Sequence, residues 1–200
     1  MNRRAFLREL AIRGFLKKDA AAREVVPRIY IGSIGSAYSR DSLTASGITH
    51  VLCVAANIEP KHSDIVAHMC ISVRDAPEEK LIDRFDECFA FIDDALSASP
   101  THRVLVHCFQ GKSRSATVVT AYLMRSRAID FSASLALLRE VRPAAQPNLG
   151  FAMQLRRFER EESAARMCAL GSGSASLRPA TGHDTAQLLD GVGGSAPPQT

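Results

Sequence analysis

The segment VLVHCFQGKSRS, residues 104–115, constrains the fold more than any other stretch of the 200-residue chain. It opens with short apolar and β-branched residues, which predict a buried strand ending at His107. It leads into a long apolar stretch, which predicts a helix over residues 115–127. The loop from Cys108 to Arg114 is therefore predicted to lie at the carboxyl end of a sheet strand, against the N-terminus of a helix.

Strands and helices alternate along the rest of the chain. Short β-branched runs bounded by turn residues predict strands at residues 28–33, 48–55, 68–73 and 103–107. Apolar side chains at helical spacing predict helices at residues 41–46, 77–97, 115–127, 132–141 and from 147 onward. This alternation predicts an α/β fold with a central mixed, partly parallel sheet flanked by helices.

The composition suits one globular domain between two differently built ends. Apolar residues make up 46% of the chain and charged residues 23%, so a sizeable core is expected. Residues 1–24 place arginines and lysines among regularly spaced apolar side chains, which predicts a basic N-terminal arm or helix. Residues 165–200 are rich in Gly, Ser, Ala and Pro, which predicts a disordered tail. The domain is predicted over residues 25–164.

Charge and hydropathy argue against several classes of partner. Residues 1–28 hold eight Lys or Arg and three acids, so the remaining chain is near balance although the net charge is +4. Nucleic-acid binding is therefore not expected. No apolar run approaches the roughly 18 residues of a membrane helix, so stable membrane insertion is not expected either. The expected location is the cytoplasm, with the nucleus as the alternative.

The role of the basic arm is left open by its sequence. It suits an extra helix on the domain or a partly disordered segment. It also suits a docking segment for a calmodulin-like partner, for a kinase or for an acidic membrane surface. A mitochondrial presequence is interrupted by Glu9 and Asp19.

The five cysteines predict neither a metal site nor a cofactor site. Their spacing is irregular and no CxxC pair occurs, which disfavours zinc ribbons and thioredoxin-type redox sites. Cys53, Cys70 and Cys88 lie in apolar segments and are predicted to be buried core thiols. Cys108, in the loop, is the cysteine whose surroundings suggest chemistry.

Two phosphate-binding interpretations compete for this loop. Gly111-Lys112-Ser113 resembles the end of a nucleotide-binding P-loop, which needs a glycine five positions before its Gly-Lys pair. The residue five positions before Gly111 is Val106, in the middle of a predicted strand. The spacing therefore excludes a nucleotide site.

The alternative is a cysteine nucleophile in a phosphate-binding loop. Successive N–H groups can curl around one phosphate, and the helix N-terminus adds positive potential. Arg114 can grip two phosphoryl oxygens, and Gly111 permits a backbone conformation that a Cβ would penalise. The same positive field stabilises a thiolate, so Cys108 is predicted to be an ionised nucleophile. The predicted phosphate-binding residues are Phe109, Gln110, Gly111, Lys112, Ser113 and Arg114.

A departing alkoxide or phenoxide also needs a proton donor on a neighbouring loop. Asp75 follows the predicted strand at residues 68–73, and loops at the carboxyl ends of strands converge on one rim. Asp75 can therefore face Cys108 as a general acid. It can equally be a helix cap, because Pro77, Glu78 and Glu79 follow it.

With these residues together, the chain resembles a dual-specificity protein phosphatase of the cysteine-based protein tyrosine phosphatase superfamily. The segment VLVHCFQGKSRSATVVTAYLM matches the family's HCxxGxSRS loop at every fixed position. The resemblance begins with PRIYIGSIGSAYSRDSLTASGITHVLCVA, continues through VRDAPEEKLIDRFDECFAFID and closes with RPAAQPNLGFAMQLRRFE. It covers about Val26 to Glu159, and the small plant-type members look particularly similar.

The resemblance implies a role for each residue of the site. Cys108 matches the nucleophile that becomes a phosphocysteine, and Arg114 matches the phosphate clamp that stabilises the transition state. Asp75 matches the general acid that then acts as a base toward water. Hydrolysis of phosphotyrosine and phosphoserine/threonine in a shallow pocket, without metal or cofactor, is implied. Phosphoprotein substrates are expected, with a MAP kinase as a candidate.

Four further residues match supporting positions. Ser115 matches the hydroxyl that hydrogen-bonds the thiolate and eases its departure. His107 matches a buried histidine that orders the loop and favours the thiolate, and Asn148 matches a structural prop near the loop. Lys112 is either a solvated lysine or a point charge that reads an acidic substrate or a second phosphate.

Related classes fit less well. Low-molecular-weight phosphatases and arsenate reductases place the cysteine near the N-terminus and before the acid, whereas Asp75 precedes Cys108. Lipid phosphatases usually follow the arginine with Thr-Gly, whereas Ser115-Ala116 stands here. A catalytically inactive phosphate-binding module would need a change at Cys108, Arg114 or Asp75.

Overall fold

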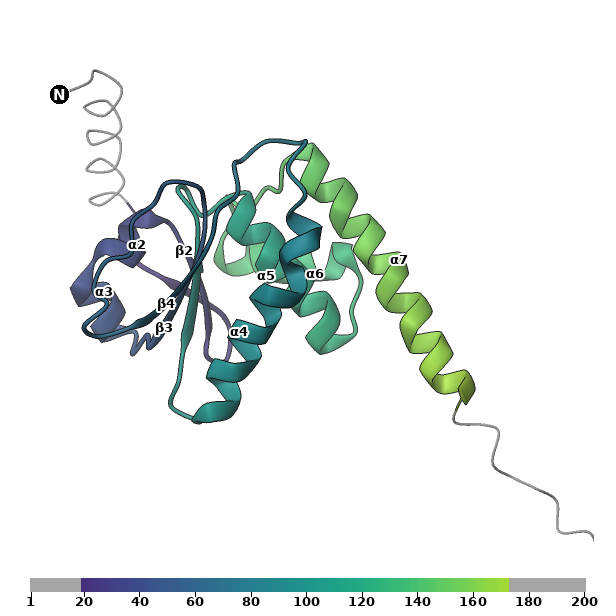
Figure 1. Cartoon of the computed structure of the whole chain (residues 1–200), viewed down its shortest axis with the longest axis horizontal. Helices are drawn as coiled ribbons and strands as arrows, with labels where there is room; N and C mark the ends of the chain where they lie inside the picture. Colours follow the sequence, from purple (N-terminus) through teal and green to yellow (C-terminus); the bar gives the residue numbers. More distant parts are fainter. Residues whose placement is uncertain (1–18, 173–200) are drawn as a thin grey trace, which may run out of the picture.

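A five-stranded sheet forms the centre of the computed structural model, which describes residues 19–172 (Figure 1). Its strands are β1 (Arg23–Val26), β2 (Ile29–Gly32), β3 (His50–Val54), β4 (Ala67–Ile71) and β5 (Val104–His107). They lie in the order β1-β2-β5-β3-β4, with β1 antiparallel to β2 and every other pair parallel. The loops that follow β2, β3, β4 and β5 therefore leave the same edge of the sheet. The predicted mixed sheet is confirmed.

Helices cover both faces of this sheet (Figure 1). One face carries the short helices α2 (Ile34–Tyr38) and α3 (Arg40–Ala45). The other carries the 3-10 turn η1 (Leu81–Arg84) and the helices α4 (Phe85–Ala98), α5 (Arg114–Arg127), α6 (Phe131–Val141) and α7 (Leu149–Ser172). This is the layered arrangement that an alternating α/β sequence predicts.

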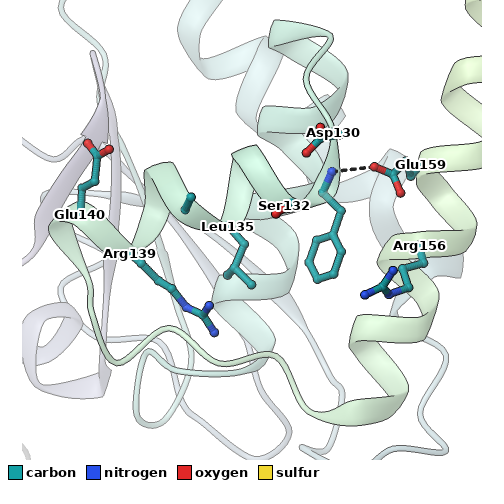
Figure 2. A pocket seen from close by; sticks show the side chains of 9 residues that line it. Asp130, Ser132, Leu135, Arg139, Glu140, Arg156 and Glu159 are labelled. Carbon is teal, nitrogen blue, oxygen red and sulfur yellow. Dashed lines mark hydrogen bonds between the residues drawn. The ribbon is translucent and has the colours of Figure 1, made fainter.

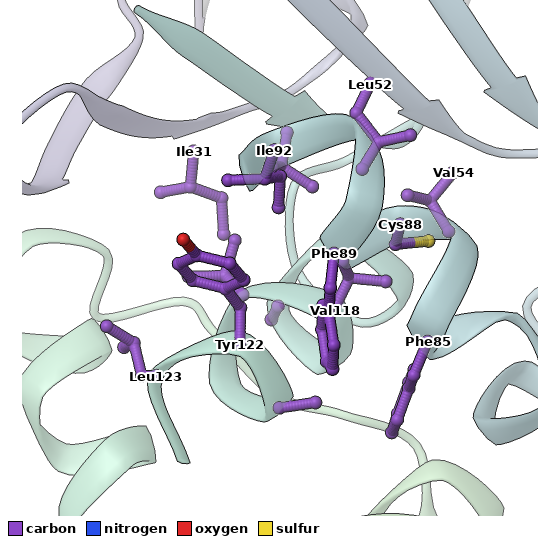
Figure 3. Packing of buried hydrophobic residues seen from close by; sticks show 14 of the residues in the cluster. Ile31, Leu52, Val54, Phe85, Cys88, Phe89, Ile92, Val118, Tyr122 and Leu123 are labelled. Atoms are coloured by element: carbon purple, nitrogen blue, oxygen red, sulfur yellow. The ribbon is translucent and has the colours of Figure 1, made fainter. Parts of the chain in front are cut away.

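The main core lies between the sheet and helices α4 and α5 (Figure 3). Phe85 and Phe89 of α4 stack with ring centroids 5.7 Å apart, and Tyr122 of α5 meets Phe89 edge-on at 5.6 Å. Helix α5 is buried at every position from Ser115 to Met124. A helix packed on all sides has little freedom to shift, so its N-terminus is a rigid support for the loop that precedes it.

The helix predicted at residues 77–97 begins later than the sequence pattern suggests. Residues 77–80 are not helical, and the regular turns start at Leu81. The reason is a contact from α7, where the side-chain amide of Gln154 donates to the carbonyl of Glu79 at 2.8 Å and accepts from the N–H of Ile82 at 2.8 Å. The side chain of Gln154 thus supplies hydrogen bonds to backbone groups at the start of the helix that have no partner within the helix itself. The loop that carries Asp75 is thus longer than predicted.

Both ends of the domain also differ from the sequence prediction. Arg23 and Glu24, predicted in the basic arm, belong to β1, because they pair with Ile31 and Tyr30 of β2. Helix α7 continues to Ser172, past the predicted domain end at residue 164, through a stretch rich in good helix formers. Most of the predicted arm and tail, residues 1–18 and 173–200, lies outside the described residues.

Two of the three predicted core thiols are buried. Burial raises the pKa of both Cys53 and Cys88 to about 12, so these thiols stay protonated. Cys70 is exposed, because it lies on the edge strand β4, which is covered only in part. Within residues 19–172, no helix is long and apolar enough to span a bilayer, and no three His, Cys, Asp or Glu side chains form a metal-binding group.

Candidate active site

The loop between β5 and α5 turns its carbonyl groups outward. The carbonyl of Phe109 accepts from the N–H of Ile34 at 3.2 Å, and that of Lys112 accepts from the N–H of Gln146 at 2.7 Å. The other outward acceptors of the loop are the carbonyls of Cys108, Gln110, Gly111 and Ser113. Since a peptide's N–H points opposite to its C=O, the N–H groups of this loop face its centre. The loop is therefore built to surround an anion.

Cys108 lies at the bottom of this ring of N–H groups. Its Sγ accepts from the N–H of Gly111 at 3.2 Å and from the hydroxyl of Ser115 at 3.3 Å. Gly111 has a φ of 66°, a left-handed conformation that a residue with a Cβ rarely adopts, so glycine suits this turn of the loop. Both contacts present a donor to the sulfur, and the N-terminus of the 14-residue helix α5 begins beside it. Each of these features favours a negatively charged sulfur.

Arg114, the first residue of α5, points its guanidinium across the loop. One nitrogen, Nη1, donates to the carbonyl of Val73 at 3.2 Å, which ties the side chain to the segment that follows β4. The Nε atom is buried and has no hydrogen-bond partner among the described residues. An unpaired buried donor is costly unless a ligand completes it. Arg114 is thus arranged to donate to a phosphoryl oxygen.

Asp75 reaches the same loop from the segment after β4. Its Oδ1 accepts from the hydroxyl of Ser113 at 2.6 Å and from the side-chain amide of Asn148 at 2.9 Å. Its Oδ2 lies 3.7 Å from Nε of Arg114, and its side chain is 38% exposed. The helix-cap alternative has no support, since no helix starts here and the carboxylate faces the loop.

His107 is buried beneath the loop, at the end of β5. Its Nδ1 donates to the carbonyl of Cys108 at 3.3 Å. Burial lowers the pKa of His107 to about 4, so the imidazole is neutral near neutral pH. It therefore orders the loop through this hydrogen bond and not as a cation.

The mouth of the loop is open and shallow. A hollow of about 270 Å³ adjoins Arg114 and Phe109, with Ala55, Ala56, Asn57 and Ile58 on its other side. Lys112 is exposed but lines a different hollow, of about 450 Å³, beside Asp19 and Arg142, and it makes no ion pair within residues 19–172. An open mouth of this kind can admit phosphorylated side chains of different lengths.

One charged residue behind the loop was missed in the sequence. Arg142 follows α6 and is only 8% exposed. Its guanidinium donates to the carbonyls of Gln110 and Gly111 and pairs with Asp19. An arginine next to a helix-ending proline resembles an ordinary surface residue in the sequence, so only the fold reveals this contact.

A second, wider pocket lies elsewhere, between α6 and α7 (Figure 2). It measures about 740 Å³, and Leu135, Arg139 and Arg156 are among its lining side chains. At its edge, Glu159 accepts a hydrogen bond from the N–H of Phe131 and so caps the start of α6. None of the predicted site residues lines this pocket. The chemistry gathers instead at the β5–α5 loop.

Comparison with known families agrees with this geometry. The family described as "Dual specificity phosphatase, catalytic domain" matches residues 29–161, more than half of the chain. The chain therefore belongs to the dual-specificity phosphatases, which are cysteine-based protein phosphatases. The predicted family and the enzyme class are confirmed.

Individual relatives are similar over most of the described domain. Dual specificity protein phosphatase 1B of Arabidopsis thaliana is 44% identical over 137 residues, which cover 68% of this chain and 81% of that protein. Dual specificity protein phosphatase 1 of the same plant is 35% identical and covers 78% of both chains. The crystal structure of human DUSP28(Y102H) matches with a TM-score of 0.69 and 32% identity, over 72% of this chain and 98% of that one.

Proposed function

We propose that Cys108, Arg114 and Asp75 carry the phosphatase reaction. The observation that supports this most directly is the loop itself, whose outward carbonyls leave N–H groups around the sulfur of Cys108. The oxygens of a substrate phosphate held there accept hydrogen bonds from these N–H groups and from Nε of Arg114, which has no other hydrogen-bond partner among the described residues. The phosphorus then lies above the sulfur, in position for in-line attack.

The first step forms the sulfur–phosphorus bond and breaks the bond from phosphorus to the leaving oxygen. The protonated carboxyl of Asp75 gives its proton to that oxygen. Because Ser113 and Asn148 both bind Oδ1, the Oδ2 atom is left facing Arg114 and the loop. Oδ2 is thus the proposed proton donor.

The second step releases inorganic phosphate. Asp75, now a carboxylate, takes a proton from water as the water oxygen attacks phosphorus and the sulfur–phosphorus bond breaks. The hydroxyl of Ser115, 3.3 Å from the sulfur, stabilises the departing thiolate. His107 and Asn148 have supporting roles, and Lys112 is the proposed contact for acidic groups near the phosphate.

The test is turnover of an aryl phosphate by the full chain with EDTA present. Cys108→Ser should lower kcat by orders of magnitude, because a neutral hydroxyl replaces the thiolate nucleophile. Cys168→Ser is the matched control, since Cys168 is exposed on α7 and lies outside the loop. Retained turnover in Cys108→Ser, or loss in Cys168→Ser alone, would contradict the assignment.

The partner predictions go further than the family does. We propose a phosphorylated MAP kinase as a protein substrate and a calmodulin-like protein or kinase as the partner of the basic arm. The support is the sequence of residues 1–24 and the enzyme class. A full chain that releases phosphate from MAP kinase no faster than from unrelated phosphoproteins would overturn the first proposal. Equal calmodulin binding by the full chain and by a chain with alanines at Arg3, Arg4 and Arg8 would overturn the second.

A further inference from the structure

Arg142 holds the back of the phosphate-binding loop. Its Nε donates to the carbonyl of Gly111 at 3.2 Å, and its Nη2 donates to the carbonyl of Gln110 at 2.9 Å. These are two of the outward carbonyls that orient the loop, and they are adjacent in the chain. A planar guanidinium can bind both at once, because its donors form a fixed fork.

Asp19 fixes this guanidinium from the other side. Its Oδ1 accepts from Nη1 of Arg142 at 2.9 Å, and its Oδ2 accepts from Nη2. Asp19 is itself anchored, because its carbonyl accepts from the hydroxyl of Ser33 at 2.9 Å, where β2 leads into α2. The charge of Arg142 is therefore matched by a carboxylate, and its donors are occupied on both sides.

Space around Gly111 makes the position of Arg142 critical. A Cβ at Gly111 would come within 2.6 Å of the carbonyl oxygen of Gly32 and 2.7 Å of Nη2 of Arg142. The loop is thus held tightly between the end of β2 and this side chain. The peptide between Gln110 and Gly111 accepts from Arg142 through its carbonyl and donates to Cys108 through its N–H. A shift of Arg142 would therefore change the orientation of the N–H that points at the sulfur.

We propose that Arg142, held by Asp19, is a positioning residue for the phosphatase reaction. The pair fixes two carbonyls of the loop so that the opposite N–H groups converge on the phosphate. Arg142 acts through the loop backbone and touches neither the substrate nor the reacting sulfur. The proposal rests on the proposed role of the Cys108 loop.

The experiment compares Arg142→Lys with Arg139→Lys in the full chain. Both arginines lie at the end of α6 and donate to backbone carbonyls, but Arg139 binds Ala145 and not the loop. Lysine keeps the charge and loses the fork. We expect kcat/KM for an aryl phosphate to fall about 10- to 100-fold in Arg142→Lys. The inhibition constant of inorganic phosphate should rise with it, while Arg139→Lys stays near wild type in both.

Two further variants separate positioning from stability. Asp19→Asn should lower activity and weaken phosphate binding, as Arg142→Lys does. Asp19→Glu, which keeps the carboxylate, should lose less of both than Asp19→Asn. In the double variant, Asp19→Asn should add little to Arg142→Lys, because both act through one contact. Additive losses would show that Asp19 does not act through Arg142.

The result that overturns the proposal is an Arg142→Lys enzyme with a lower melting temperature but normal kcat/KM and normal phosphate inhibition. That outcome would leave Arg142 a purely structural residue. It would leave the proposed chemistry intact, because loss of turnover in Cys108→Ser tests that chemistry separately.

Discussion

Two aspartate–arginine pairs flank the phosphate-binding loop, one in front and one behind. At the front, Oδ2 of Asp75 lies 3.7 Å from Nε of Arg114, and this Nε makes no hydrogen bond within residues 19–172. At the back, Asp19 and Arg142 share two hydrogen bonds, and both arginine faces are occupied. The residue types are the same, but the front pair is loose, an ion pair without a hydrogen bond, and the back pair is tight, joined by two hydrogen bonds.

The difference follows from what each pair has to do. A general acid must gain and lose a proton, and a phosphate clamp must have donors to offer, so a tight ion pair would disable both. A positioning pair needs the opposite, because a fixed geometry requires donors and acceptors that are already satisfied. Loose charges at the front and paired charges at the back therefore distinguish chemistry from support.

Among variants of the two pairs, the largest effect is expected from Arg114→Lys. A lysine supplies one point charge and lacks the planar fork that lets arginine bind Val73 through one nitrogen and a phosphoryl oxygen through another. We expect kcat to fall about 10²- to 10³-fold, the cost of losing one preorganised donor. The control is Arg125→Lys on the same helix, where the arginine pairs with Asp86 and Glu162 at the surface. Equal losses in the two variants would break the contrast between site and surface.

Asp75→Asn should have the next largest effect on a substrate that needs a proton. An amide can still accept from Ser113 but cannot protonate a leaving oxygen, so kcat for phenyl phosphate should fall about 10²-fold. An aryl phosphate whose phenol is a strong acid leaves without help and should lose much less. Equal losses for both leaving groups would show that Asp75 does not act as the acid.

A smaller change is expected at Asn148, which supports the front pair. Its side chain both donates to Asp75 and, through Oδ1, caps α7 by accepting from the N–H of Phe151 at 2.9 Å. Asn148→Ala should lose about 1 kcal/mol of unfolding free energy as well as activity. Asn148→Ser keeps a capping oxygen but not the amide donor, so it should lose activity about tenfold with little loss of stability.

The sequence predicts the front of the site far better than its back. Cys108, Arg114 and Ser115 lie in one contiguous strand–loop–helix segment, and Asp75 follows β4, another parallel strand of the same sheet. Local spacing and sheet topology therefore place all four at one edge of the sheet. Arg142 and Asp19 are 123 positions apart, and no periodicity links them. The late start of the helix at Leu81 was missed for the same reason, because Gln154 lies 72 positions from Ile82. Contacts between distant segments depend on how the helices pack, which patterning does not specify.

The back pair also predicts a pH dependence of stability. Burial alone would raise the pKa of Asp19, but Arg142, Ser33 and Arg23 outweigh it and lower that pKa below its ordinary value. The folded state therefore binds the Asp19 proton less tightly than the unfolded state, and the pair stabilises the fold above about pH 4. This contribution is lost as the pH falls through the folded-state pKa.

Asp19→Asn removes that contribution and should lower the free energy of unfolding near pH 7. The deficit relative to wild type should shrink as the pH falls below about 4, measured by urea unfolding across this range. Asp94→Asn, on the exposed face of α4, should show no comparable deficit. A deficit that does not change with pH would mean that Asp19 stabilises the fold by packing and not by charge. The back pair would then lose the electrostatic basis on which it differs from the front.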